Sequence, residues 1–354
     1  IEVTCFGQEF NPSTYAIAKA DMMIRGGDPD NMRFGDTLSD DQFAGFTFDY
    51  CISNPPFGID WKREQKKVEE EAAKGEQGRF APGLPKISDG QQLFVLNGLS
   101  KLAPNGKMAI IQNGSPLFSG DAGSGSSEIR RYILENDWLD CIVQLSKDMF
   151  MNTGISTYIW ICSKNKPAYR EGKVQLIDAS HCYEARRKSI GTKRNDITDQ
   201  CRELIVKAYG SFENCAVYGD KSGIYCESKI FETVEFGYNK IVVERPQRDE
   251  NGEIVLKKGK PVGDASLRDT ENVPLTQDID RYFEREVLPY AEDAWIEKKK
   301  TKAGYEIPMT RYFYEYKAPE KVEDIVARIH VLEADISASL DKLFAEEKQV
   351  WLEK

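Results

Sequence analysis

The feature that most constrains the fold is the alternation of short apolar runs with longer amphipathic segments over the first 180 residues. Runs such as 48–53 (FDYCIS) and 107–112 (KMAIIQ) are typical of buried strands, whereas residues 91–102 show the apolar periodicity of a helix. Strands separated by helices of this length favour parallel β-α-β units. The sequence therefore predicts an α/β protein built on a doubly wound sheet.

Polar residues mark the ends of the first three predicted strands. Glu9, Asp36 and Asn54 each lie at or just past such an end, and the helix after Glu9 starts with the capping sequence NPST. Ligands of doubly wound sheets bind at the carboxyl ends of the strands, so we expect these three side chains to converge there. The predicted strands are 1–6, 32–38, 48–53, 107–112, 141–145 and 157–162, and the predicted helices begin near 11, 91 and 127.

Two further segments of the first half have unusual compositions. Residues 62–79 are densely charged and lack large apolar side chains, which is typical of a solvated, mobile loop or an exposed helix. The glycine-rich run 120–125 lies between a predicted strand and a predicted helix, and we interpret it as a flexible connection. Neither segment is expected to contribute to a binding site.

The pattern changes after about residue 190. We predict two regions, a catalytic region at 1–190 and a mainly helical region at 191–354. Residues 249–263 predict a hairpin with a turn at Asn251-Gly252.

The last helix, near 319–350, has apolar residues at intervals of three and four, with Ser339 in one slot. This pattern predicts either packing on its own domain or a helix–helix interface with a partner. The apolar series is Val322, Ile325, Ile329, Leu332, Ile336 and Leu343.

The segment SNPPFG at 53–58 has the chemistry needed to hold an exocyclic amine. The nitrogen of adenine N6 or cytosine N4 is a poor nucleophile, because its lone pair is delocalised into the ring. The side-chain oxygen of Asn54 and the backbone carbonyl of Pro55 can accept its two N–H bonds and favour a pyramidal, nucleophilic form. Pro55 and Pro56 fix φ, and Phe57 offers a face on which an extruded base can stack.

The alternative interpretation is that these prolines only end a strand. The placement of the motif favours a functional role, because it follows an apolar strand and lies 18 positions after Asp36.

Several strings of this sequence resemble the modification subunits of type I restriction–modification systems, a family of adenine-N6 DNA methyltransferases. The resemblance covers most of residues 1–190 and about 290–345. The strings are GQE at 7–9, GDTL at 35–38, FDYCISNPPFG at 48–58, MFMNTGISTYIWI at 149–161, DAWI at 293–296 and GYEIPMTRYFY at 304–314.

The resemblance implies a Rossmann-like methyltransferase fold that uses S-adenosyl-L-methionine. By this resemblance, Glu9 binds the cofactor's ribose hydroxyls, and Asp36 with Thr37 contacts its adenine. Residues 54–57 clamp the target amine. Phe150 matches an aromatic position that either packs against the flipped base or belongs to the core.

One departure from the family concerns the strand that precedes Glu9. The family's first strand ends in a glycine loop that lets the backbone approach the methionine part of the cofactor, and no such loop precedes Ile1. We therefore expect a partial domain whose sheet lacks its first strand. A chain of this kind is expected to bind S-adenosylmethionine weakly.

Charge and cysteine content bear on the partners and the compartment. The formal net charge is −10, which argues against strong DNA binding by the chain alone, since neutralising phosphates requires basic residues. The resemblance implies DNA as substrate, with separate specificity and restriction subunits. The eight scattered cysteines and two histidines predict no metal site, and a reduced cytoplasmic setting without membrane contact is expected.

Two alternatives remain at this stage. The same motif occurs in methyltransferases that act on protein glutamine or on RNA. The missing glycine loop instead favours a non-catalytic interaction module. The sequence recognised on DNA, the choice between adenine and cytosine by chemistry alone, and the role of residues 215–290 are not predictable from these patterns.

Overall fold

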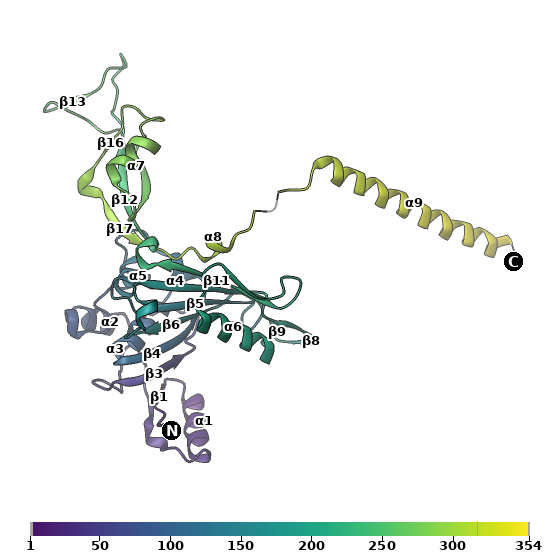
Figure 1. Cartoon of the computed structure of the whole chain (residues 1–354), viewed down its shortest axis with the longest axis horizontal. Coiled ribbons are helices and arrows are strands. Elements are labelled where there is room, and N and C mark those ends of the chain that lie inside the picture. Colours follow the sequence, from purple (N-terminus) through teal and green to yellow (C-terminus); the bar gives the residue numbers. More distant parts are fainter. Residues whose placement is uncertain (1–2, 317, 353–354) are drawn as a thin grey trace. The chain divides into compact units, whose positions relative to one another are not determined.

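The computed structural model describes residues 3–316 and 318–352, and it describes side chains up to residue 342. The chain separates into two compact units, Ile1–Met309 and Thr310–Lys354. Figure 1 shows the elements of both units, coloured along the sequence.

The centre of the first unit is a seven-stranded mixed sheet with the order β10-β11-β7-β5-β6-β4-β3. Strands β3, β4, β5 and β7 all run in the same direction, because β3 pairs with β4 and β5 with β7 in parallel, and β6 is antiparallel to both β4 and β5. Their carboxyl ends therefore lie at one edge of the sheet. The strands are β3 (Phe48–Ser53), β4 (Leu102–Gln112), β5 (Leu139–Leu145), β6 (Tyr158–Ser163), β7 (Lys173–Ala179), β10 (Ala216–Gly219) and β11 (Tyr225–Glu232).

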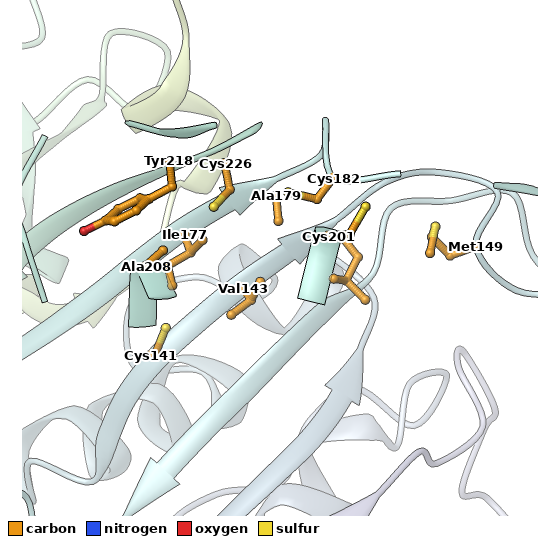
Figure 2. Packing of buried hydrophobic residues seen from close by; sticks show 11 residues of the cluster. Cys141, Val143, Met149, Ile177, Ala179, Cys182, Cys201, Ala208, Tyr218 and Cys226 are labelled. Carbon is orange, nitrogen blue, oxygen red and sulfur yellow. The ribbon is translucent and has the colours of Figure 1, made fainter. Parts of the chain in front are cut away.

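This sheet confirms the predicted α/β fold, and its core follows from the apolar runs. The helices that accompany it are α3 (Gln91–Ser100), α4 (Ser115–Phe118), α5 (Gly125–Glu135) and α6 (Asp199–Ser211). Cys201 and Ala208 of α6 pack against Cys141 and Val143 of β5 and Ile177 of β7 (Figure 2). All eight cysteines, each within the described ranges, are free thiols.

The N-terminal residues form a separate two-stranded parallel sheet. Strand β1 spans Gly7–Glu9 and pairs with β2 (Met32–Phe34), while α1 (Pro12–Ile24) connects them and is capped by Asn11. The prediction of a strand at 1–6 is therefore wrong for the described residues 3–6, and residues 1 and 2 lie outside the description. The bounds of β1 are determined by its hydrogen bonds to β2, because an apolar run forms a strand only where another strand pairs with it.

The sheet is interrupted between β1 and β3. Within the described residues, β3 pairs on one side only, with β4, and β1 pairs only with β2. Tyr50 and Ile52 on β3 are 75% and 87% exposed, which is unusual for large apolar side chains in a strand. Among the described residues, the N-terminal strands therefore form a sheet of their own and do not extend the central sheet beyond β3.

The charged segment 62–79 was predicted to be a solvated, mobile loop or an exposed helix, and the helix is found. It contains α2 (Gln65–Ala72), a largely exposed helix whose Val68 is fully buried. The last residue of the segment, Arg79, is largely buried, which composition did not predict. Its hydrogen-bond partners include residues that are distant in the sequence.

The glycine-rich run 120–125 is packed as well. Asp121 forms an ion pair with Lys240 at 2.8 Å, and a Cβ at Gly125 would lie 1.9 Å from the carbonyl oxygen of Leu84. The expectation of a flexible connection is therefore wrong, because only glycine allows this backbone approach.

The region after residue 190 holds strands as well as helices. A four-stranded antiparallel sheet forms around β12, with β15, β16 and β17 paired to it, and α7 packs on this sheet. Residues 249–263 contain a short hairpin whose turn lies at Lys258-Gly259, and Gly252 makes a second turn with positive φ. The elements are β8 (Glu184–Ile190), β9 (Lys193–Asp196), β12 (Gly237–Glu244), β13 (Leu256–Lys257), β14 (Lys260–Pro261), β15 (Asp269–Pro274), α7 (Ile279–Glu286), β16 (Trp295–Ile296), β17 (Lys302–Tyr305) and α8 (Met309–Phe313).

The second unit contains α9 (Val322–Leu352), which covers the helix predicted near 319–350. The apolar side chains of its seam are exposed or half-exposed over the described positions from Val322 to Ile336. Leu343 of this series lies beyond the residues whose side chains are described. In the described part of the chain, no helix has the length and apolar character to span a bilayer.

Candidate active site

The turn after β3 presents the amide of Asn54 at the carboxyl edge of the sheet. Pro55 is buried and anchors the turn, while Asn54 and Pro56 are exposed. Gly58 has a φ of +63°, which allows the chain to reverse after Phe57. Within the described residues no hydrogen bond is recorded for the Asn54 side chain. Its amide is thus free to bind an external group, as the motif predicts.

Two aromatic residues from different loops meet at this turn. The ring of Phe57 contacts the ring of Phe150 edge-on, with centroids 6.4 Å apart and an interplanar angle of 81°. Phe150 lies in the loop after β5, and both rings are half-buried. The structure therefore brings Phe57 and Phe150 together, as a base-binding surface would need. Phe150 also packs against the core cluster of β5, β7 and α6, so both predicted roles of this residue stay open.

A hollow of about 340 Å³ opens next to Gly58. Its lining includes Lys86, Asp89, Gln92 and Ser115, which the sequence patterns did not single out. Gln92 is buried and donates to the carbonyl of Ser126 at 3.2 Å, so the wall is fixed by hydrogen bonds. This volume falls within the range of small-ligand pockets.

Glu9 and Asp36 occupy the ends of the two N-terminal strands. Oε1 of Glu9 accepts from the backbone N–H of Asn11 at 2.7 Å. Oδ1 of Asp36 accepts from Leu38 and Ser39 at 2.8 and 2.9 Å, as in a turn-forming aspartate. Both carboxylates are half-buried, and no partner is recorded for their second oxygens in the described part of the chain.

The segment after the Asn54 turn ties these strand ends to the main sheet. The guanidinium of Arg63 lies over the ring of Phe10, 5.2 Å from its centroid. Nη1 of Arg79 donates to the carbonyl of Thr37 at 2.7 Å, and Nη2 donates to that of Leu38 at 3.2 Å. Arg79 therefore holds the turn that contains Asp36.

Arg79 is itself held by a buried network. Its Nε and Nη2 donate to the two carboxylate oxygens of Glu71 at 2.6 Å each, and Nη1 donates to Oδ1 of Asn97 at 2.8 Å. Burial raises the pKa of Glu71, but the hydrogen bonds and charge of Arg79 outweigh it, and the pKa is lowered overall. Sequence patterns missed this residue, since its partners come from three separate segments.

A comparison with known protein families matches residues 1–251 to the family described as N-6 DNA Methylase. Among curated proteins, the MjaIX methylase subunit of a type I restriction enzyme from Methanocaldococcus jannaschii is 30% identical over 213 residues. The HindI methylase subunit of a type I restriction enzyme from Haemophilus influenzae is 27% identical over 314 residues. These alignments cover 60% and 86% of this chain.

Among solved structures, the methyltransferase subunit of a type I restriction–modification system from Streptococcus thermophilus has a TM-score of 0.54 and 29% identity. The match covers 66% of this chain and 46% of that chain. The chain spans 37% of the length of the M. jannaschii relative and 62% of the H. influenzae relative.

Proposed function

Since this chain belongs to the N-6 DNA methylase family, we propose that it takes part in methyl transfer from S-adenosyl-L-methionine to the N6 amine of adenine in DNA. The observation that carries the proposal is the exposed amide of Asn54, which lies beside the buried Pro55 and next to the Phe57–Phe150 pair. Both curated relatives are methylase subunits of type I restriction enzymes. The chain is proposed to act as the modification subunit of such a complex.

The residues at the two N-terminal strand ends fit the proposed cofactor. Glu9 and Asp36 each have one carboxylate oxygen fixed by backbone N–H groups and a second oxygen with no recorded partner among the described residues. A carboxylate with one oxygen available can accept hydrogen bonds from ribose hydroxyls or from an adenine amine. Thr37, which follows Asp36 in the sequence, is proposed to contact the cofactor as well. When bound, S-adenosylmethionine supplies a methyl group on a positively charged sulfur, so the site needs no strong general base.

The role of Asn54 and Pro55 is to hold the target amine. Their two oxygens accept its two N–H bonds, which draws the nitrogen lone pair out of conjugation with the ring. Phe57 and Phe150 stack on the extruded base and keep water away from the amine. Asn54 is exposed, and its side chain has no hydrogen bond among the described residues, so its removal should affect methyl transfer more than folding.

Methyl transfer from radiolabelled S-adenosylmethionine to duplex DNA tests the proposal, using the chain co-expressed with a type I specificity subunit. Asn54→Ala should lower the rate constant by about 100-fold or more, the loss typical when one preorganised polar group is removed. Asn251→Ala removes another exposed asparagine and serves as the control. Detection of N4-methylcytosine or methylglutamine in place of N6-methyladenine, or an unimpaired Asn54→Ala variant, would refute the assignment.

The helix α9 is proposed to bind the specificity subunit. Its apolar seam is exposed within its own unit, and a 31-residue helix of this kind is stabilised by packing against other helices. Ile329→Glu with Ile336→Glu should abolish co-purification with that subunit, whereas Ala334→Glu, off the seam, should not. Equal retention of the partner by both variants would contradict this interface.

The cytoplasm is the proposed location, because the eight cysteines, all within the described ranges, form no disulfide, which suits a reducing compartment. Burial raises the pKa of Cys162 to about 12, so this thiol remains protonated at neutral pH.

A further inference from the structure

The hairpin formed by β8 and β9 is basic, although the chain as a whole is acidic. Residues 184–196 carry five basic and two acidic side chains, a net charge of +3, in a chain whose formal net charge is −10. The basic residues are Arg186, Arg187, Lys188, Lys193 and Arg194. A positive patch in an acidic protein is a local feature that needs its own explanation.

The hairpin is built onto the loop that carries Phe150. The hydroxyl of Thr192 donates to the carbonyl of Phe150 at 3.0 Å, and its backbone N–H donates to that of Met151 at 3.0 Å. The amide of Asn195 donates to the carbonyl of Lys147 at 2.9 Å. A Cβ at Gly191 would lie 2.6 Å from the Met151 carbonyl oxygen, so the hairpin tip is held closely against this loop.

The place of the hairpin follows from the sheet topology. It comes directly after β7, whose carboxyl end lies at the same edge as those of β3 and β5. The Asn54 turn, the Phe150 loop and the basic hairpin are therefore neighbours in one functional edge of the sheet. A DNA strand that delivers a base to Phe57 and Phe150 passes close to this hairpin.

Most of the positive charge on the hairpin is not neutralised within the protein. Asp196 is occupied by ion pairs with Arg186 and Lys193. Arg187, Lys188 and Arg194 are exposed, and no acidic partner is recorded for them in the residues that the structure describes.

The surface of the hairpin has a shallow, open depression of about 640 Å³, lined by Arg186, Arg187, Lys188 and Asp196. Three cations therefore border the same space. Such a cluster suits a row of phosphates better than scattered surface lysines do.

We propose that the β8–β9 hairpin binds the phosphate backbone of DNA next to the target base. The inference rests on the proposed function, since it takes the Phe57–Phe150 pair as the base-binding surface. Phosphate contacts position a strand without reading its sequence, which matches a subunit whose specificity comes from a partner. The alternative occupant is an acidic surface of a partner protein. It would not account for the position of the hairpin against the loop that carries Phe150, whereas a DNA strand would.

The test compares two triple variants in DNA binding. Arg187→Gln, Lys188→Gln and Arg194→Gln remove the unpaired hairpin charges. The control replaces the three exposed lysines of the β13–β14 hairpin, Lys257, Lys258 and Lys260, by Gln. Both variants change the net charge equally, so only position separates them.

The measurement is fluorescence anisotropy with a labelled duplex, over salt concentrations of about 50 to 200 mM, using the chain co-expressed with a type I specificity subunit. Three lost phosphate contacts should lower the slope of log K against log salt by about 2.7, which reduces the salt effect over this range about 40-fold. The control should keep the parent slope. A parent complex without salt-dependent binding, or equal slopes for both variants, would overturn the proposal.

A variant that keeps the positive charge tests whether weaker DNA binding comes from lost charge or from a folding defect. Arg187→Lys with Arg194→Lys should bind DNA within about threefold of the parent, because phosphate attraction depends mainly on charge. If this variant fails like the Gln variant, the hairpin does not act through charge. Weaker binding of partner subunits with unchanged DNA binding would also overturn the proposal.

Methyl transfer by the same preparations separates failure of this inference from failure of the proposed function. The Gln variant should have a KM for DNA raised at least tenfold and a kcat within about twofold of the parent. If the parent methylates adenine and the Gln variant binds DNA normally, only the hairpin assignment fails. If the parent methylates no DNA, the proposed function fails whatever the salt slopes are.

Discussion

Arg79 is expected to determine how firmly the Asp36 turn is held. Its side chain is 9% exposed and that of Glu71 is 20% exposed. Arg79→Met keeps most of the side-chain volume but leaves the Glu71 carboxylate with only the backbone N–H of residue 79 as donor. It also leaves the carbonyls of Thr37 and Leu38 without the guanidinium donor. Removing one partner of a fully buried ion pair costs about 3–5 kcal/mol of unfolding free energy.

We expect about 3 kcal/mol for Arg79→Met, at the lower end of that range, because Glu71 retains some contact with solvent. Urea denaturation at neutral pH measures this loss. Arg25→Met is the matched control, since its ion pair with Asp21 has both side chains more than half exposed. Such a surface pair contributes about 0–1 kcal/mol. A loss for Arg79→Met no larger than that of Arg25→Met would refute the reasoning.

The same pair predicts a pH dependence. The folded pKa of Glu71 lies below its ordinary value of 4.5, so its contribution to stability is present above that pH. The contribution is lost as the pH falls through the lowered folded pKa. Arg79→Met should remove this part of the acid dependence. Calorimetry should also show that Arg79→Met binds S-adenosylmethionine more weakly than the parent chain does. If the substitution only lowered the overall stability, the folded fraction would bind the cofactor with the parent affinity.

Three further substitutions have expected outcomes. Asp140→Asn breaks a pair with Arg170 in which both side chains are 3% exposed, and should cost about 3–5 kcal/mol in urea denaturation. Gly125→Ala places a Cβ 1.9 Å from the Leu84 carbonyl oxygen and should lower thermal stability by about 1–3 kcal/mol, whereas an unchanged Tm would show that the backbone relaxes. Phe150→Ala removes a stacking surface and should raise the KM for DNA about tenfold or more in methyl-transfer assays; it should also lower the thermal stability, because the ring packs against the core cluster.

The strands and the Asn54 turn could be predicted because local sequence determines them. The run FDYCIS forms β3 with the predicted bounds, and the two prolines end it. Asn11 caps α1 as the NPST sequence indicates. The side-chain chemistry of the turn was also evident from the sequence, whereas its contact with Phe150 depends on the parallel arrangement of β3 and β5.

The parts that escaped prediction depend on partners far away in the sequence. Composition suggested a solvated segment at 62–79, but Arg79 is buried through bonds to Thr37 and Asn97. Strand β1 begins later than its apolar run, because the ladder with β2 decides its extent. Hydrophobic periodicity contains no information about such long-range pairing.

Under the proposed function, the arrangement of the sheet edge accounts for how an acidic chain would act on DNA. Three loops at the carboxyl ends of β3, β5 and β7 are proposed to hold the amine, stack the base and bind phosphates, and each comes from a different parallel strand. Positive charge concentrated on the β8–β9 hairpin attracts the duplex at one place, while the acidic remainder repels it elsewhere. Such a charge distribution disfavours unproductive binding to other faces and leaves affinity dependent on a partner subunit. Making the surface uniformly more basic should therefore increase non-specific DNA binding without a matching increase in methyl transfer.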